Sequence, residues 1–141
     1  MKEQYHGAYL YKRIVQAKLF IDANYAQQIN LNDIADEACF SKFHFIRTFK
    51  SVYGKTPHQY LINTRIERAM ELLRKGLPVT EVCWMIGFES QSSFSHLFRK
   101  IVGSSPSVYM QLQQEMKKQL FHQPLVFIPG CFAEKKGWKK E

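Results

Sequence analysis

Two segments of the chain carry side chains that can recognise the edges of nucleic-acid bases. In segment 41–50, the guanidinium of Arg47 can bind guanine through two hydrogen bonds or pair with a phosphate, and the ring of Phe43 can contact a thymine methyl group. In segment 90–99, the imidazole of His96 can donate a hydrogen bond to a base edge. These residue types indicate base recognition, provided that a helix presents them together on its surface.

The two segments belong to an internal repeat. Each copy has a serine, two phenylalanines four residues apart, a glycine, and a hydroxyl residue followed by proline and then by tyrosine. These positions are Ser41, Phe45, Phe49, Gly54, Thr56, Pro57 and Tyr60, and then Ser90, Phe94, Phe98, Gly103, Ser105, Pro106 and Tyr109. The offset is constant, because 90 − 41, 98 − 49 and 109 − 60 all equal 49. Each copy reads as a short helix, a turn and a longer helix, a unit used in DNA recognition.

The longer helix of each copy has two distinct faces when its residues are spaced at 100°. Apolar residues form the inner faces, Phe45, Phe49 and Val52 in the first copy and Phe94, Phe98 and Ile101 in the second. The outer faces carry Phe43, Arg47 and Lys50 in the first copy and Ser92, His96 and Arg99 in the second. Because the inner faces agree and the outer faces differ, the repeat predicts one scaffold with two different reading surfaces.

Several outward side chains have ordinary alternative roles. Phe43 either contacts DNA or packs beneath the first helix or the C-terminal tail. His96 either reads a base or is a solvated surface histidine, and its place in the repeat favours the first. Gln91 either reads adenine or is a plain polar residue of a first helical turn. Phosphate contacts are expected from three cations, Lys42, Lys50 and Arg99.

The elements that must position these residues are all helical. The apolar spacing and the cap residues predict helices over residues 8–25, 31–38, 41–53, 56–75, 78–86, 90–102 and 105–118. In the first helix the expected core stripe is Tyr11, Ile14, Val15, Leu19 and Phe20. The fourth helix, about 20 residues and about 30 Å long, would hold the two reading surfaces apart. Tail 119–141 can pack back, dock a partner or be mobile, and the sequence does not choose.

Composition narrows the class of protein. The 141 residues have a net charge of +8, and the stretch 41–60 contains cations without a single acid, as expected of a face directed at phosphates. No apolar run has the length of a membrane span or of a signal peptide, so a cytoplasmic protein is expected. Cys39, Cys83 and Cys131 lack metal-site or disulfide spacing and are expected to be reduced hydrophobic residues.

These motifs resemble the DNA-binding domain of the AraC/XylS family of bacterial transcription regulators. The resemblance covers about residues 11–111 and is most specific over 79–100 with the glycine, proline and tyrosine that follow. It implies an all-α fold of seven helices, in two helix-turn-helix subdomains bridged by a long central helix. The expected division is 8–55 for the first subdomain, 56–75 for the linking helix, 76–118 for the second subdomain and 119–141 for the tail.

The resemblance also implies a site and a function. Recognition helices over 41–53 and 90–102 would contact bases through Phe43, Ile46, Arg47, Gln91, Ser92, Ser93 and His96. Ile46 is apolar where a polar residue is common, so the first reading surface is expected to be the less selective one. The implied function is sequence-specific binding of double-stranded promoter DNA by a transcription regulator, with an activator favoured and RNA polymerase as a further partner. No cofactor, metal or small-molecule ligand is expected, and no ligand-binding domain precedes the first helix, so a free-standing regulator is favoured over a fragment.

Three other classes of function compete with this interpretation. A non-specific or architectural DNA-binding protein would share the basic charge and its salt dependence without preferring a sequence. An enzyme acting through Cys131 is disfavoured, because no histidine or carboxylate is visibly paired with that thiol. A protein-docking module acting through the tail is the remaining alternative.

Overall fold

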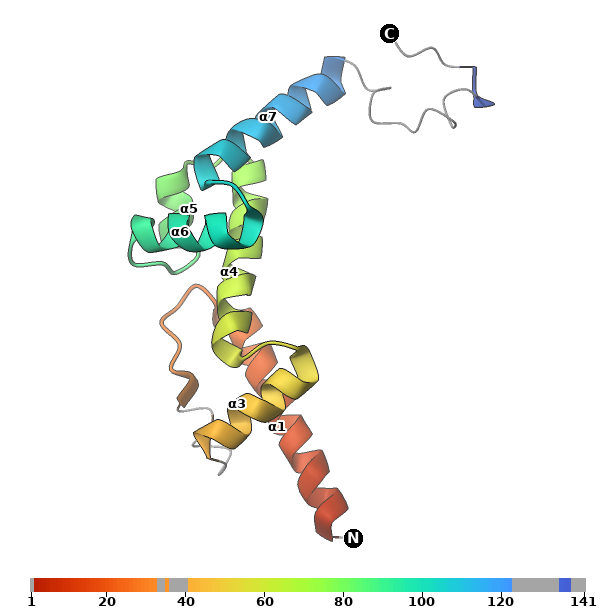
Figure 1. The fold of residues 1–141 in the computed structure, drawn as a ribbon, viewed down its shortest axis with the longest axis vertical. Coiled ribbons are helices and arrows are strands. Elements are labelled where there is room, and N and C mark those ends of the chain that lie inside the picture. The colour runs from red at the N-terminus through yellow and green to blue at the C-terminus, as the bar shows by residue number, and fades with distance from the viewer. Residues whose placement is uncertain (1, 33–34, 36–40, 123–134, 138–141) are drawn as a thin grey trace.

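The computed structural model describes residues 2–32, 35, 41–122 and 135–137, and the helices in this part form an all-α protein (Figure 1). Their bounds are α1 Lys2–Asn24, α3 Lys42–Tyr53, α4 Pro57–Arg74, α5 Val79–Met85, α6 Gln91–Val102 and α7 Pro106–His122. The described part thus contains six helices and not the predicted seven. The predicted second helix, 31–38, falls largely outside the described residues, although residues 31, 32 and 35 are helical.

Helix α4 is the central element of the fold. It runs along the long axis of the molecule, with α1 and α3 toward one end and α5, α6 and α7 toward the other (Figure 1). Each of the other five described helices contacts it. Its start follows from sequence, because the Thr56 side chain and the Gln59 side chain form a reciprocal capping box and Pro57 occupies the first helical position. With 18 residues, α4 is about 27 Å long.

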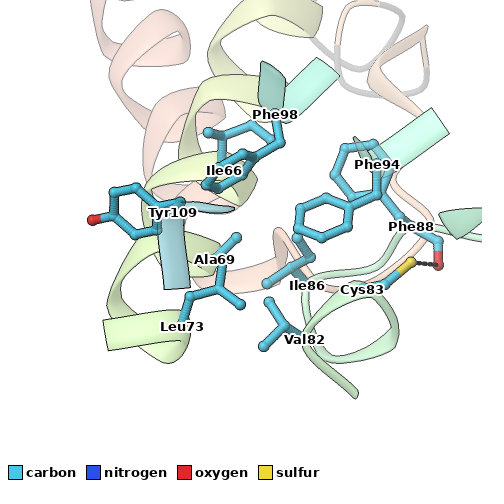
Figure 2. Packing of buried hydrophobic residues seen from close by; sticks show 10 residues of the cluster. All are labelled: Ile66, Ala69, Leu73, Val82, Cys83, Ile86, Phe88, Phe94, Phe98 and Tyr109. Atoms are coloured by element: carbon cyan, nitrogen blue, oxygen red, sulfur yellow. Dashed lines mark hydrogen bonds between the residues drawn. The ribbon is translucent and has the colours of Figure 1, made fainter. Parts of the chain in front are cut away.

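Two separate hydrophobic cores lie along α4. Among the described residues, the first core contains seven buried ones, Ile14, Ala17, Ile21, Ala35, Phe45, Phe49 and Leu61. The second core contains ten, Ile66, Ala69, Leu73, Val82, Cys83, Ile86, Phe88, Phe94, Phe98 and Tyr109 (Figure 2). Leu61 and Ile66 belong to different cores, so α4 passes from one core to the other between these two residues.

The repeat seen in the sequence recurs as repeated packing geometry. Phe49 meets Tyr60 edge-on, with ring centroids 5.7 Å apart and an interplanar angle of 77°. Phe98 meets Tyr109 in the same way, at 5.5 Å and 68°. Edge-to-face pairs of this kind add to the energy of apolar burial. The phenylalanine pairs predicted to face inward are therefore core residues in both copies, as expected.

The face of α1 that enters the first core differs from the predicted one. Ile14 is buried as expected, but its buried companions are Ala17 and Ile21, and the other four predicted stripe residues are exposed. Those four are Tyr11, Val15, Leu19 and Phe20. Both stripes have helical spacing, and the packed one includes a small residue, Ala17, in place of a large apolar side chain. The larger side chains were therefore a misleading guide to the buried face.

Three further details differ from expectation. Val52 and Ile101, predicted to face inward, are exposed, and the residue that follows each of them, Tyr53 or Val102, packs against the core instead. Helix α1 begins at Lys2, well before the predicted start. Helix α7 continues past 118 to His122, because no residue before Pro124 interrupts a helix. None of the six described helices combines the length and apolar content that a membrane span needs.

Candidate nucleic-acid interface

Matching caps hold the two candidate recognition helices, α3 and α6. The Oγ atoms of Ser41 and Ser90 accept the backbone N–H three residues further on, at 3.2 and 3.4 Å. Gly54 and Gly103 end the helices with φ of 75° and 97°, a left-handed conformation that favours glycine. Both serines predicted as N-caps are confirmed in that role. Each residue between the caps of α3 therefore has an equivalent position between the caps of α6.

The outer face of α3, here called the first reading surface, presents Lys42, Phe43, Arg47 and Lys50 to solvent. Phe43 is the most unusual of them, because its side chain is 75% exposed while Phe45, two residues on, is 1% exposed. A ring this exposed is not packed beneath α1, which was one of the two alternatives for Phe43; the other, packing beneath the tail, involves residues that lie largely outside the described part of the chain. A single exposed apolar residue is common on a protein surface, so this exposure leaves the Phe43 ring available to a partner without showing that it has one.

Ile46 occupies a different position from its predicted companions. It is half-buried and packs against the first core, so only part of its side chain is available at the surface. An apolar side chain in this position can contribute a methyl contact but no hydrogen bond to a base.

The outer face of α6, the second reading surface, is more polar. Gln91, Ser92, Ser93, His96 and Arg99 are all exposed. Gln91, Ser92 and Ser93 form the first turn, where a recognition helix usually meets base edges, and His96 lies one turn further along. The backbone N–H of Ser93 is used by the cap, which leaves its hydroxyl group at the surface. The two surfaces thus differ in chemistry although their scaffolds match.

The electrostatic character of both surfaces suits a polyanion. Neither α3 nor α6 contains an acidic residue. The two salt bridges in the described residues, Lys18–Asp22 and Arg68–Glu71, lie on α1 and α4. Within that part of the chain, Lys42, Lys50 and Arg99 therefore keep their charge available for phosphates.

Helix α4 and its contacts place the two surfaces relative to one another. In Figure 1, α3 and α6 start on the same side of the molecule and run toward α4. Tyr60 secures α4 to α1, since its hydroxyl donates to the Asp22 carboxylate at 2.9 Å and Asp22 also pairs with Lys18 at 2.7 Å. Burial, followed by this hydrogen bond, raises the pKa of Tyr60.

No contact was predicted for Arg65 from the sequence, although this residue joins α4 to the turn after α1. Its guanidinium is buried and donates to two backbone carbonyls in the turn after α1. The available signal was its spacing, because an arginine four residues after Leu61 and four before Ala69 lies on the apolar face of a helix.

The thiol of Cys83 is buried in the second core, and burial raises its pKa, so it is a core residue as predicted. Cys39 and Cys131 lie outside the described residues.

The known sequences that resemble this chain are helix-turn-helix proteins and transcription regulators. A sequence profile described as a helix-turn-helix domain matches residues 34–112, more than half of the chain. The HTH-type transcriptional activator AarP of Providencia stuartii is 33% identical over 97 residues, which cover 68% of this chain and 72% of AarP. The probable transcriptional regulator LumQ of Photobacterium leiognathi is 34% identical over 104 residues, covering 70% of this chain and 42% of LumQ. The chain therefore spans less than half the length of LumQ.

A comparison of folds agrees with the sequence matches. The DNA-binding domain of AdpA, a global transcriptional factor solved in complex with a target DNA, matches with a TM-score of 0.69 and 29% sequence identity. The match covers 75% of this chain and 96% of that domain. The described helices thus have the architecture of a domain that has been seen on DNA.

Proposed function

The chain belongs to the AraC family of helix-turn-helix transcription regulators, which is a DNA-binding family and not a class of enzyme. On that premise we propose that it reads one asymmetric site with both of its reading surfaces. In this mechanism α3 and α6 enter successive major grooves on one side of the duplex. The observation that carries the proposal is the pair of acid-free, exposed and chemically different helix faces held on one α4.

Spacing supports a two-groove mechanism. Successive major grooves on one side of B-DNA are about 34 Å apart. Helix α4 is about 27 Å long; α3 shares the first core with its Leu61, and α6 shares the second core with its Ile66, Ala69 and Leu73. A single chain can then make the contacts that two subunits of an ordinary helix-turn-helix dimer make. The site need not be palindromic, because the two reading surfaces differ.

Each surface has a distinct chemical role in this proposal. Arg47 binds a guanine edge or a phosphate, and Phe43 and Ile46 contact thymine methyl groups or sugars. On α6, Gln91 and His96 bind base edges, with Ser92 and Ser93 as shorter donors and acceptors. Phosphates are held by the three cations named above, Lys42, Lys50 and Arg99, which set the position of the helices but read no sequence.

We further propose that the chain activates transcription by contacting RNA polymerase when bound at a promoter in the bacterial cytoplasm. AarP, most of whose length this chain covers, is named an activator, which supports this direction of regulation. In transcription reactions with purified polymerase, the chain should raise transcript yield from a promoter carrying its site. A matched promoter with a scrambled site is the control, and lowered yield from the intact promoter would indicate a repressor.

The experiment that tests sequence-specific reading is selection from random DNA followed by competition. Selection should return a motif with two preferred segments, and unrelated DNA should compete at least about a thousandfold less well at physiological salt. An architectural DNA-binding protein would show the same loss of affinity with salt but no preferred motif. Recovery of unselected sequence at comparable affinity would therefore favour that second function.

A further inference from the structure

The buried guanidinium of Arg65 joins α4 to the turn that follows α1. Arg65 is 7% exposed; its Nε atom donates to the carbonyl oxygen of Tyr25 at 2.7 Å, and Nη2 donates to that of Gln27 at 2.9 Å. Burial lowers the pKa of Arg65 and Glu89 opposes that shift, yet a guanidinium stays charged in proteins. Two charge-assisted hydrogen bonds therefore fix segment 25–27 against the middle of α4.

The same segment also touches the turn between α5 and α6. A Cβ atom placed on Gly87 would lie 2.6 Å from the carbonyl oxygen of Ala26, so the two backbones are in direct contact. Gly87 has a φ of 88°, and its carbonyl oxygen accepts a hydrogen bond from Gln28 Nε2 at 3.4 Å. The turn after α1, which leads out of the first core, thus meets the turn that leads into the second recognition helix.

Aromatic contacts extend this connection into α6. The Arg65 Cζ atom lies 5.6 Å from the ring centroid of Phe88, within the range of a cation–π contact. The Phe88 ring is 5.5 Å from that of Phe94, a buried residue of α6 (Figure 2). A displacement of segment 25–28 would therefore act on the helix that carries the second reading surface.

Position along α4 explains why such a connection matters. Leu61 is the last α4 residue of the first core and Ile66 is the first fully buried α4 residue of the second. The stretch of α4 between them is about one helical turn long, and Ile62 within it packs against the second core. Arg65 lies in this turn, and its contacts bridge the two cores away from the α4 backbone.

We propose that Arg65, segment 25–28 and Gly87–Phe88 form a strut that fixes α6 in orientation relative to α3, so that Arg65 is a positioning residue for reading two DNA segments in phase. The role in DNA reading rests on the proposed function, whereas the fixed orientation does not. A purely local role for Arg65, satisfying two carbonyls for stability, would instead leave the relative orientation of the cores unchanged on substitution.

Residual dipolar couplings of the intact 141-residue chain separate these two roles without DNA. In the native protein, the amides of α1 and α3 and those of α5, α6 and α7 should fit one common alignment tensor. In Arg65→Lys, which keeps the charge but cannot reach both carbonyls as a fork, the two sets should each fit well but require different tensors. Arg74→Met on the same helix is the matched control, because Arg74 is exposed and helix propensity is nearly unchanged; one tensor should remain.

A second variant tests the strut from its other side. Gly87→Ala places a methyl group against the Ala26 backbone and strains a left-handed φ, so it should separate the tensors as the Arg65 substitution does. This variant also serves if Arg65→Lys does not fold. A common tensor in every folded strut variant would overturn the proposal.

Binding to sites with altered spacing then tests the consequence for DNA. Adding one base pair between the two preferred segments rotates one against the other by about 34° and moves it by about 3.4 Å. The native chain and Arg74→Met should lose about tenfold or more in affinity, whereas Arg65→Lys should bind the original site about tenfold less tightly and lose little more on insertion. Equal spacing penalties in native and Arg65→Lys chains would contradict the strut. If the tensors separate but the native chain is indifferent to spacing, the strut stands and the two-surface function falls.

Discussion

Phe43 and Phe45 lie two residues apart on opposite faces of α3, and this gives a matched pair of substitutions. Phe43 is 75% exposed and Phe45 is 1% exposed. Phe43→Ala removes little buried area, so the free energy of unfolding should change by less than about 0.5 kcal/mol. Phe45→Ala empties a site in the first core and should cost about 3–5 kcal/mol, a large share of a typical stability of about 5–15 kcal/mol.

For the folded molecules of each variant, the loss of DNA affinity should follow the opposite order and be larger for Phe43→Ala than for Phe45→Ala. Loss of the Phe43 ring removes one apolar contact in the groove, which should weaken specific binding by about 1–3 kcal/mol while leaving binding to unrelated DNA nearly unchanged. Urea unfolding of both variants and titration of the selected site at fixed salt are the two assays. A Phe43→Ala chain that is clearly destabilised, or one that binds its site with full affinity, would refute the assignment of Phe43 to the reading surface.

Three further predictions concern charge, selectivity and pH. Lys50→Ala and Arg99→Ala should each weaken binding to all sequences alike and reduce the slope of log affinity against log salt by about 1, and a changed base preference in either would show a misassigned phosphate contact. Arg47→Ala should relax preference in one segment of the selected motif and His96→Ala in the other, and identical motifs from both variants would reject two separate reading surfaces. Burial, and then the hydrogen bond to Asp22, raise the pKa of Tyr60 above 10.0. The stability that the protonated Tyr60 hydroxyl contributes should therefore be complete below about pH 10 and be lost as the pH rises through the pKa of the folded state. Tyr60→Phe should cost about 1 kcal/mol near neutral pH and show a shallower alkaline loss of unfolding free energy than the native chain, and parallel pH curves would contradict this.

The parts of the fold that could be predicted are those that local chemistry specifies. Ser41 and Ser90 are caps because a side-chain oxygen can satisfy a free N–H at a helix start, and Gly54 and Gly103 end helices because a left-handed residue is needed there. Thr56 followed by proline marks the start of α4 for similar reasons. The repetition of these signals made the architecture readable from one sequence.

The parts that could not be predicted depend on contacts between distant segments. Tyr11, Val15 and Leu19 recur at a helical spacing, as the buried Ile14, Ala17 and Ile21 also do, and only the position of α3 and α4 decides which stripe packs. Arg65 could be recognised as an arginine on an apolar face, but its acceptor carbonyls lie 40 and 38 residues earlier in the chain. Nothing local to Arg65 specifies those partners.

The candidate interface falls between these two cases. Spacing alone places Phe43, Arg47 and His96 on the outer faces, and all three are exposed in the structure. The half-buried state of Ile46 was not predicted, because it depends on how α3 tilts against the first core. Which base each exposed side chain contacts remains a prediction.

The most direct test of the central claim is to measure stoichiometry and footprint on the same complex. The selected site, bound by the intact chain, is examined by hydroxyl-radical footprinting and by sedimentation equilibrium. The account predicts one chain per site and two protected segments about one helical turn, or about 10 base pairs, apart on one side of the duplex. Two chains on a palindromic site, or one chain protecting a single segment, would contradict it.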